Sequence, residues 1–133
     1  MTEKNEALLN PRVIIVQKLY GHDLNKETQI TFAKHRYKKF IKDVVNGTIE
    51  RRELIQGILD KEFSSDINNN KTELIIKLMI MAAIFEFMYM HKTPVKVIIS
   101  EYLKVCDYFT GTPQKNFLNA ILDKASKITR TSS

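Results

Sequence analysis

Two short stretches, one near each end of the chain, combine planar, amide and cationic side chains. Single-stranded RNA is typically held by such a combination, because Lys and Arg neutralise phosphates and aromatic rings stack on unpaired bases. Tyr20 and Phe117 are the aromatic candidates, although apolar periodicity alone favours a place in the core for both. The candidates are Arg12, Gln17, Lys18 and Tyr20 in the first stretch, and Lys115, Asn116, Phe117, Asn119, Lys124, Lys127 and Arg130 in the second.

Residues that could carry catalysis do not come together in this sequence. The three histidines fall in predicted loops or at helix ends, with no cysteine or carboxylate at ligand spacing, so no metal site is predicted. Ser100 and Cys106 have no histidine at helical spacing to act as a base, and no glycine-rich loop follows a strand. Glu86 is the one carboxylate expected to be buried, and a hydrogen-bonded structural role is favoured over that of a general acid. We therefore expect no enzyme, no metal and no cofactor.

Composition describes a small, basic, helical protein. The 133 residues suffice for one domain with a substantial core, and the net charge of +6 is compatible with a nucleic-acid partner. Four glycines and three prolines among many Lys, Glu, Ile and Leu residues favour an all-α fold. A single cysteine and the absence of an apolar signal region at the start lead us to expect a cytoplasmic protein. We predict one domain over residues 1–133, with residues 1–9 flexible and residues 130–133 as a tail.

The stretch 71–90 is the element around which the others must pack. Its apolar residues lie on every side of a helical wheel, as in a membrane span or in a helix at the centre of a bundle. A span needs about 20 nearly uncharged residues, whereas the longest charge-free run here is Leu78–Phe85. The sequence therefore predicts a buried central helix and no membrane contact.

All three prolines are predicted to stand where a helix starts. Asn10-Pro11, Thr93-Pro94 and Thr112-Pro113 each place a good capping residue before a proline, which is tolerated in the first helical turn because that turn leaves its N–H groups unpaired. Helices are therefore expected from each of these sites, and apolar residues follow at three- and four-residue steps after each.

A further helix is expected between the first proline site and the central helix. After a loop at residues 22–31, apolar residues at helical steps predict one long helix over residues 32–63, bent near Gly47, and then a break at residues 64–70. The whole pattern thus gives five long helices in one bundle. The outer face of the long helix is predicted to be a solvated, charged face. It carries Lys34, Arg36, Lys38, Lys39 and Lys42, then Glu50, Arg51, Arg52 and Glu53.

Four segments, in order, resemble the NusB family of bacterial transcription antitermination factors. RVIIVQKLY is similar to the family's R-x-x-A-V-Q-x-L-Y, and AAIFEF to A-x-Y-E-L. TPVKVIISEYLKVCDYF resembles P-x-K-V-x-I-N-E-x-x-x-L-A-K-x-F, and KNFLNAILDKASK resembles F-V-N-G-V-L-D-K. The resemblance extends over nearly the whole chain and implies an all-α fold of two helical sub-bundles around the buried central helix.

The resemblance also implies a function. The family binds the boxA element of ribosomal RNA leader transcripts together with NusE, which is also a small-subunit ribosomal protein, and the pair helps RNA polymerase read through terminators. By matching motif, Arg12, Gln17 and Tyr20 belong to an N-terminal RNA-facing stretch, and Phe117 and Asn119 to a C-terminal one, so both aromatics become expected RNA contacts. The expected RNA-binding residues are Lys4, Arg12, Gln17, Tyr20, Lys115, Phe117, Asn119 and Lys124.

The chain departs from the family pattern in its basic residues. ALLNP precedes Arg12 where the family has an arginine-rich run, Met81 stands where an arginine is common, and Ala120 replaces a glycine. Fewer phosphate contacts predict weaker RNA binding and a salt dependence that is flatter by about one unit of slope for each missing phosphate contact. Two alternatives stay open: a helical module that binds NusE but has lost most RNA affinity, and the recognition half of an RNA-modifying enzyme, as in relatives that carry a methyltransferase domain. Monomer and homodimer are both left open.

Overall fold

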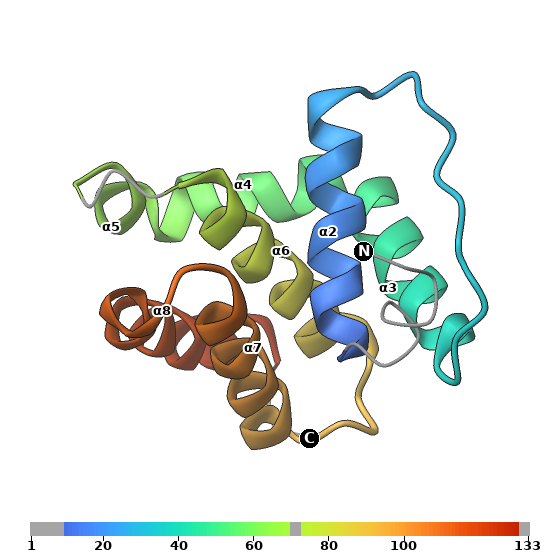
Figure 1. The fold of residues 1–133 in the computed structure, drawn as a ribbon. Coiled ribbons are helices and arrows are strands. Elements are labelled where there is room, and N and C mark those ends of the chain that lie inside the picture. Colours follow the sequence, from blue (N-terminus) through green and yellow to red (C-terminus); the bar gives the residue numbers. More distant parts are fainter. Residues whose placement is uncertain (1–9, 70–72, 131–133) are drawn as a thin grey trace.

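The computed structural model describes residues 10–69 and 73–130, and within these residues every regular element is a helix (Figure 1). The all-α fold predicted from the sequence is therefore confirmed. The elements are α2 (Pro11–Leu24), α3 (Lys38–Glu50), α4 (Arg52–Glu62), α5 (Ser64–Asn69), α6 (Leu74–Tyr89), α7 (Val95–Phe109), the 3-10 helix η1 (Thr112–Gln114) and α8 (Lys115–Thr129).

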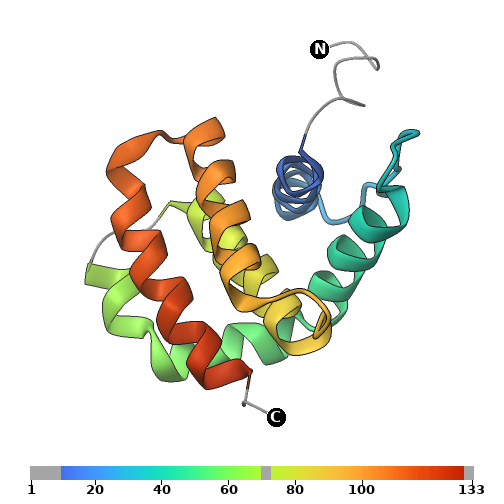
Figure 2. The ribbon, with the colours of Figure 1, turned by 90° about the horizontal axis from the view of Figure 1, so that it is seen from below.

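Helix α6 is the centre of the molecule, as its all-round apolar pattern predicted. Every residue from Leu78 to Phe87 is buried, and α6 packs against α2, α3, α4, α7 and α8. In Figure 2, α2 and α3 lie on one side of α6 while α7 and α8 lie on the other, which gives the two sub-bundles. In the described part of the chain, no helix combines the length and the apolar character that crossing a membrane requires.

The three proline sites begin helices in different ways. Asn10 caps α2 as predicted, since its Oδ1 accepts a hydrogen bond of 2.8 Å from the Arg12 backbone N–H. Helices also begin at the other two sites, but the predicted threonine cap followed by a first-turn proline was wrong there. Pro94 is itself the residue before α7, with no side-chain cap, and Thr112–Gln114 forms η1, so that α8 begins only at Lys115. A proline fixes φ in a range that suits either a first helical turn or the extended residue before it, and the sequence does not distinguish the two.

The predicted long helix over residues 32–63 is instead two helices, α3 and α4. They meet at Arg51, whose backbone (φ −105°, ψ 21°) lies outside the helical range, and residues 25–37 connect α2 to α3 without a helix. The Arg51 guanidinium lies 4.4 Å from the ring centroid of Tyr89 on α6. Because both α3 and α4 pack on α6, the corner between them lets each apolar face reach the core.

Gly47 does not bend the chain, although the sequence pointed to it. It lies inside α3, where a Cβ would overlap the Phe85 ring of α6, so glycine is required by close packing of the two helices. Two smaller predictions were also wrong. Residues 64–69 form α5 instead of a break, and residues 22–24 remain within α2 instead of joining the loop.

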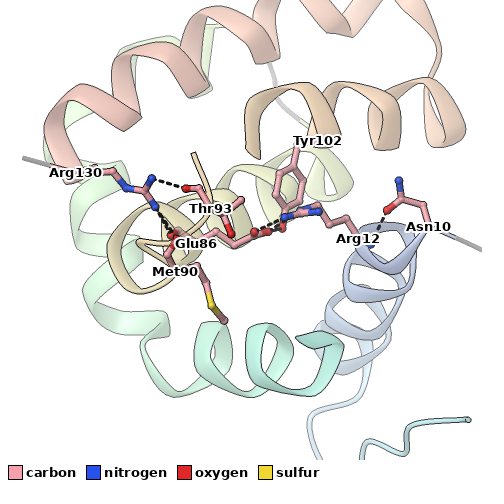
Figure 3. Close-up of polar contacts among 7 residues, drawn as sticks. All are labelled: Asn10, Arg12, Glu86, Met90, Thr93, Tyr102 and Arg130. Carbon is pink, nitrogen blue, oxygen red and sulfur yellow. Dashed lines mark hydrogen bonds and ion pairs between the residues drawn. The ribbon is translucent and has the colours of Figure 1, made fainter. Parts of the chain in front are cut away.

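Arg130 was predicted to begin a tail, but its side chain holds the end of the central helix. Its guanidinium donates four hydrogen bonds of 2.6–3.0 Å to backbone carbonyls near the end of α6 and in the following turn. Figure 3 shows the carbonyl-bearing residues Glu86, Met90 and Thr93 around this guanidinium. The last carbonyls of a helix lack partners within the helix, and Arg130 supplies them from the end of α8. The accepting residues are Glu86, Phe87, Met90 and Thr93.

Candidate nucleic-acid interface

Arg12, the basic residue expected to contact phosphate, points into the protein. The residue is about 8% exposed, and its side chain donates from Nε and Nη2 to the two carboxylate oxygens of Glu86, at 2.9 and 2.6 Å. The Tyr102 hydroxyl donates to the same carboxylate at 2.5 Å (Figure 3). The Arg12 guanidinium also lies 4.8 Å from the ring centroid of Phe40 on α3. Glu86 thus has the hydrogen-bonded structural role that the sequence predicted.

The electrostatics of this cluster keep Arg12 charged and paired with Glu86. Burial by itself lowers the pKa of Arg12, but the hydrogen bond to Glu86 and the nearby negative charge raise it above its ordinary value. Burial, and next the charge of Glu86, raise the pKa of Tyr102 well above its ordinary value, so the phenol keeps its proton. The guanidinium is therefore committed to an internal ion pair, and little of it faces solvent for a phosphate.

Tyr20 lies at the surface, in a groove that three helices form. The residue is 38% exposed and lines an open groove of about 240 Å³ between α2, the start of α6 and the end of α7. The groove has both apolar and polar walls and one acidic residue at its edge. Its other lining residues are Glu73, Leu74, Ile75, Phe109 and Thr110.

The first turn of α8 lies at the same end of the molecule. Arg130, just after α8, binds carbonyls at the C-terminal end of α6, so the C-terminal ends of the two helices lie together. Because α6 and α8 pack along each other, their N-terminal ends also lie together. Phe117 in the first turn of α8 and Tyr20 in the groove are therefore both placed around the N-terminal end of α6.

The predicted residues of α8 divide between its two edges. Successive residues turn by about 100° around a helix, which places Lys115 and Asn119 on one edge and Phe117 and Lys124 on the other. The Lys115 ammonium pairs with Asp107 of α7 at 2.9 Å, so its edge faces α7. Phe117 is half-buried against the core, and Asn119 is exposed.

Lys124 lies on the edge of α8 that faces α4 and α5. Its ammonium donates to the Glu62 backbone carbonyl at 3.2 Å, lies 3.7 Å from an Asp66 carboxylate oxygen and sits 4.9 Å from the ring centroid of Phe63. The side chain remains about half exposed. These contacts hold Lys124 against the protein and separate it from the groove beside Tyr20.

The remaining predicted residues have different positions. Gln17 is half-buried on α2, one turn before Tyr20, and Lys4 lies outside the described residues. The periodicity gave no signal for the groove residues Phe109 and Thr110, because the end of one helix and the side of another meet only in the folded chain. The structure thus places Tyr20 and the first turns of α8, which carry Lys115, Phe117 and Asn119, at the same end of α6, although Phe117 faces the opposite edge of α8 from Lys115 and Asn119. Arg12 and Lys124 lie elsewhere.

The amino-acid sequence was compared with models of known protein families. The family model described as the NusB family matches residues 9–127. The chain belongs to the NusB family. The resemblance found in its four sequence segments is thereby confirmed.

Three relatives illustrate how far NusB proteins have diverged from this chain. Each is named Transcription antitermination protein NusB. The protein of Thermodesulfovibrio yellowstonii is 25% identical over 135 residues, which cover 87% of this chain and 89% of the relative. That of Mesorhizobium japonicum is 22% identical over 107 residues, with coverages of 80% and 69%. That of Bradyrhizobium diazoefficiens is 25% identical over 88 residues, which cover 66% of this chain but only 53% of the relative, so the chain spans about half of that protein.

The fold also matches a solved NusB structure. The structure of T. maritima NusB superposes with a TM-score of 0.74 at 17% identity, and 88% of each chain is covered. The side chain of Met81, where the sequence predicted a departure from the family pattern, is fully buried in α6.

No group of three or more His, Cys, Asp or Glu side chains that could hold a metal ion occurs within residues 10–69 and 73–130.

Proposed function

We propose that this NusB-family protein binds boxA-type single-stranded RNA of ribosomal RNA leader transcripts together with the ribosomal protein NusE. In this role it would help RNA polymerase to read through terminators. The match to the NusB family over residues 9–127 supports the proposal most strongly. In the same proposal, the chain acts as a single helical domain and needs no cofactor.

The surface around the N-terminal end of α6 is the proposed contact for RNA bases. An exposed tyrosine ring beside an open groove is suited to stack on an unpaired base, and amide groups such as Asn119 can hydrogen-bond base edges. Lys115, which is half-buried and paired with Asp107, keeps a cationic group beside this surface. The proposed interface therefore joins a stacking platform, hydrogen-bonding groups and positive charge at one end of the molecule.

A titration with RNA tests the proposal. Fluorescence anisotropy of a labelled boxA-like RNA would be followed at about 50 and 200 mM salt, with and without NusE, because phosphate contacts weaken steeply over that range. We expect binding at the lower salt concentration that NusE strengthens. If the RNA does not bind at either salt concentration, with or without NusE, the proposal is wrong.

A second candidate function is a protein-binding module that recruits NusE but has lost most RNA affinity. The commitment of Arg12 to Glu86 favours this candidate, since the basic residue at the start of α2 has an internal partner. A pull-down that recovers NusE but no RNA would support the module and exclude the RNA-binding role.

A further inference from the structure

Residues 34–42, here called the basic segment, hold a concentration of charge that the proposed interface does not use. The segment contains five basic residues and no acidic one, a formal charge of +5, while the whole chain carries +6. No Asp or Glu occurs between Glu27 and Asp43. The rest of the chain is thus almost neutral, and one short segment accounts for most of the protein's net positive charge.

The positive charges of the basic segment contribute little to the stability of the fold. Lys38 and Lys39 occupy the first turn of α3, at the positive end of the helix dipole, where cations are unfavourable, and Lys38 and Lys42 repel each other at i, i+4. Lys39 pairs with Asp43 at 2.7 Å. Lys34, Lys38 and Lys42 are exposed, and none has a carboxylate partner among residues 10–69 and 73–130. Such an arrangement suits a negatively charged partner better than it suits folding.

An aromatic ring accompanies the charge. Tyr37, the residue before α3, is 48% exposed, and the Arg36 guanidinium lies 5.4 Å from its ring centroid. A ring beside a guanidinium gives a flat surface on which a nucleic-acid base can stack. An acidic protein surface, by contrast, would be attracted by the positive charges of the segment alone and would gain nothing from the ring. The combination therefore favours single-stranded nucleic acid over an acidic protein.

The basic segment continues onto the exposed side of α2. Lys34 and Lys38 line a small pocket together with Lys18, and Lys18 lines the adjoining groove of about 240 Å³ with Gln17 and Gly21. Around α2, Tyr20 lies about 160° from Lys18, with Gln17 and Gly21 between them. A Cβ at Gly21 would meet nothing within 4 Å, so the surface there is open. In Figures 1 and 2 the segment, where α3 begins, lies on the far side of α2 from α8.

We propose that the basic segment binds the phosphate backbone of the RNA whose bases meet Tyr20, and that this RNA crosses α2 over Gln17 and Gly21. The inference rests on the proposed function for the identity of the ligand. It adds a second contact surface on the opposite side of α2, which the sequence pattern alone presents as an ordinary solvated face.

Neutralising the segment tests the inference in the full chain. The variant Lys34→Gln/Lys38→Gln/Lys42→Gln removes three charges, and the control Lys61→Gln/Lys92→Gln/Lys96→Gln removes three charges from other exposed positions. Two labelled RNAs of about 12 nucleotides, one boxA-like and one oligouridine, would be titrated at several salt concentrations. We expect the slope of log affinity against log salt to fall by about two units for the first variant, at about 0.7 for each phosphate that is no longer neutralised on a single strand, and by less than one unit for the second.

The outcomes separate this inference from the proposed function. The decrease in slope should be equal on both RNAs, because phosphate contacts carry no sequence information. Equal decreases in the two lysine variants would overturn the inference and leave RNA binding intact. A segment variant with unchanged RNA binding but weakened NusE binding would assign the charge to a protein partner and also overturn it. If the wild-type chain binds neither RNA at low salt, the proposed function fails and the inference fails with it.

Discussion

Arg12 and Glu86 are 74 positions apart in the chain, and two side-chain hydrogen bonds join them inside the protein. The pair connects the first turn of α2 to the last turns of the central helix, and Tyr102 adds α7 to the same carboxylate. One buried carboxylate thus ties both sub-bundles to α6. The pair therefore helps to fix the position of α2 relative to α6 and α7.

Breaking the Arg12–Glu86 pair from one side should be costly. We expect Arg12→Met to lower the free energy of unfolding by about 3–5 kcal/mol, because it leaves the buried Glu86 carboxylate without its main partner. The double variant Arg12→Met/Glu86→Leu should lose clearly less than the sum of the two single variants. Urea unfolding of all four proteins measures this coupling. Strictly additive losses would show that the two side chains do not stabilise each other.

Stability at alkaline pH should depend on Tyr102. Because its pKa is raised in the folded protein, the folded state keeps the phenol proton at a pH where the unfolded state, with a pKa of about 10, releases it. This stability is complete below about pH 10 and is lost above it, at about 1.4 kcal/mol per pH unit. Tyr102→Phe has no such proton, so its unfolding free energy should decline less steeply between about pH 10 and 11. Parallel curves for the two proteins would contradict the raised pKa.

The two helical glycines of α3 and α4 should respond in opposite ways to alanine. At Gly47 the new methyl group would overlap the Phe85 ring, and we expect Gly47→Ala to destabilise the protein by about 1–3 kcal/mol. At Gly57, which is exposed and has open space around it, Gly57→Ala should stabilise by about 0.5–1 kcal/mol. Thermal or urea unfolding checks both. A stabilising change at Gly47 would mean that Phe85 moves aside at no cost.

Much of the fold could be predicted from the sequence, because the buried face of a helix appears in the sequence as apolar residues at regular spacing. The all-round apolar run of α6, the cap at Asn10 and the apolar faces of α7 and α8 are local patterns, and all three were confirmed. The break at Arg51 was missed since it has no local signal: neither glycine nor proline stands there, and the turn arises from packing of α3 and α4 on α6.

The candidate site was less predictable, because it depends on contacts between distant residues. Nothing in the order of residues shows that Arg12 turns inward to Glu86, or that Arg130 reaches the carbonyls of α6 from 37 to 44 residues away. Tyr20 fits the apolar periodicity of α2, yet the structure leaves its ring partly exposed beside the ends of two other helices. A sequence pattern gives the face of a helix, whereas exposure depends on which neighbour covers that face.

The acidic residue in the Tyr20 groove should oppose RNA. Glu73 is exposed at the start of α6, and its charge repels phosphates that approach within a Debye length. We expect Glu73→Gln to raise RNA affinity by about twofold to threefold at 50 mM salt, and this gain to vanish at high salt. Glu53→Gln provides the matched control, since Glu53 lines a groove with Met88 and Ile128 near the other end of α6. Equal gains from both variants would indicate a general charge effect and no RNA at the groove.

The proposed RNA interface is tested most directly by comparing two exposed tyrosines at opposite ends of α6. Tyr20 and Tyr89 are 38% and 41% exposed, and Tyr89 lies beside Arg51, away from the groove. Anisotropy titrations with boxA-like RNA and NusE would be made for Tyr20→Ala, Tyr89→Ala and the wild type. If Tyr20 stacks on a base, Tyr20→Ala should weaken binding by about 1–3 kcal/mol, while Tyr89→Ala stays within about twofold of the wild type. Equal affinities for all three folded proteins would contradict an RNA contact at this end of the central helix.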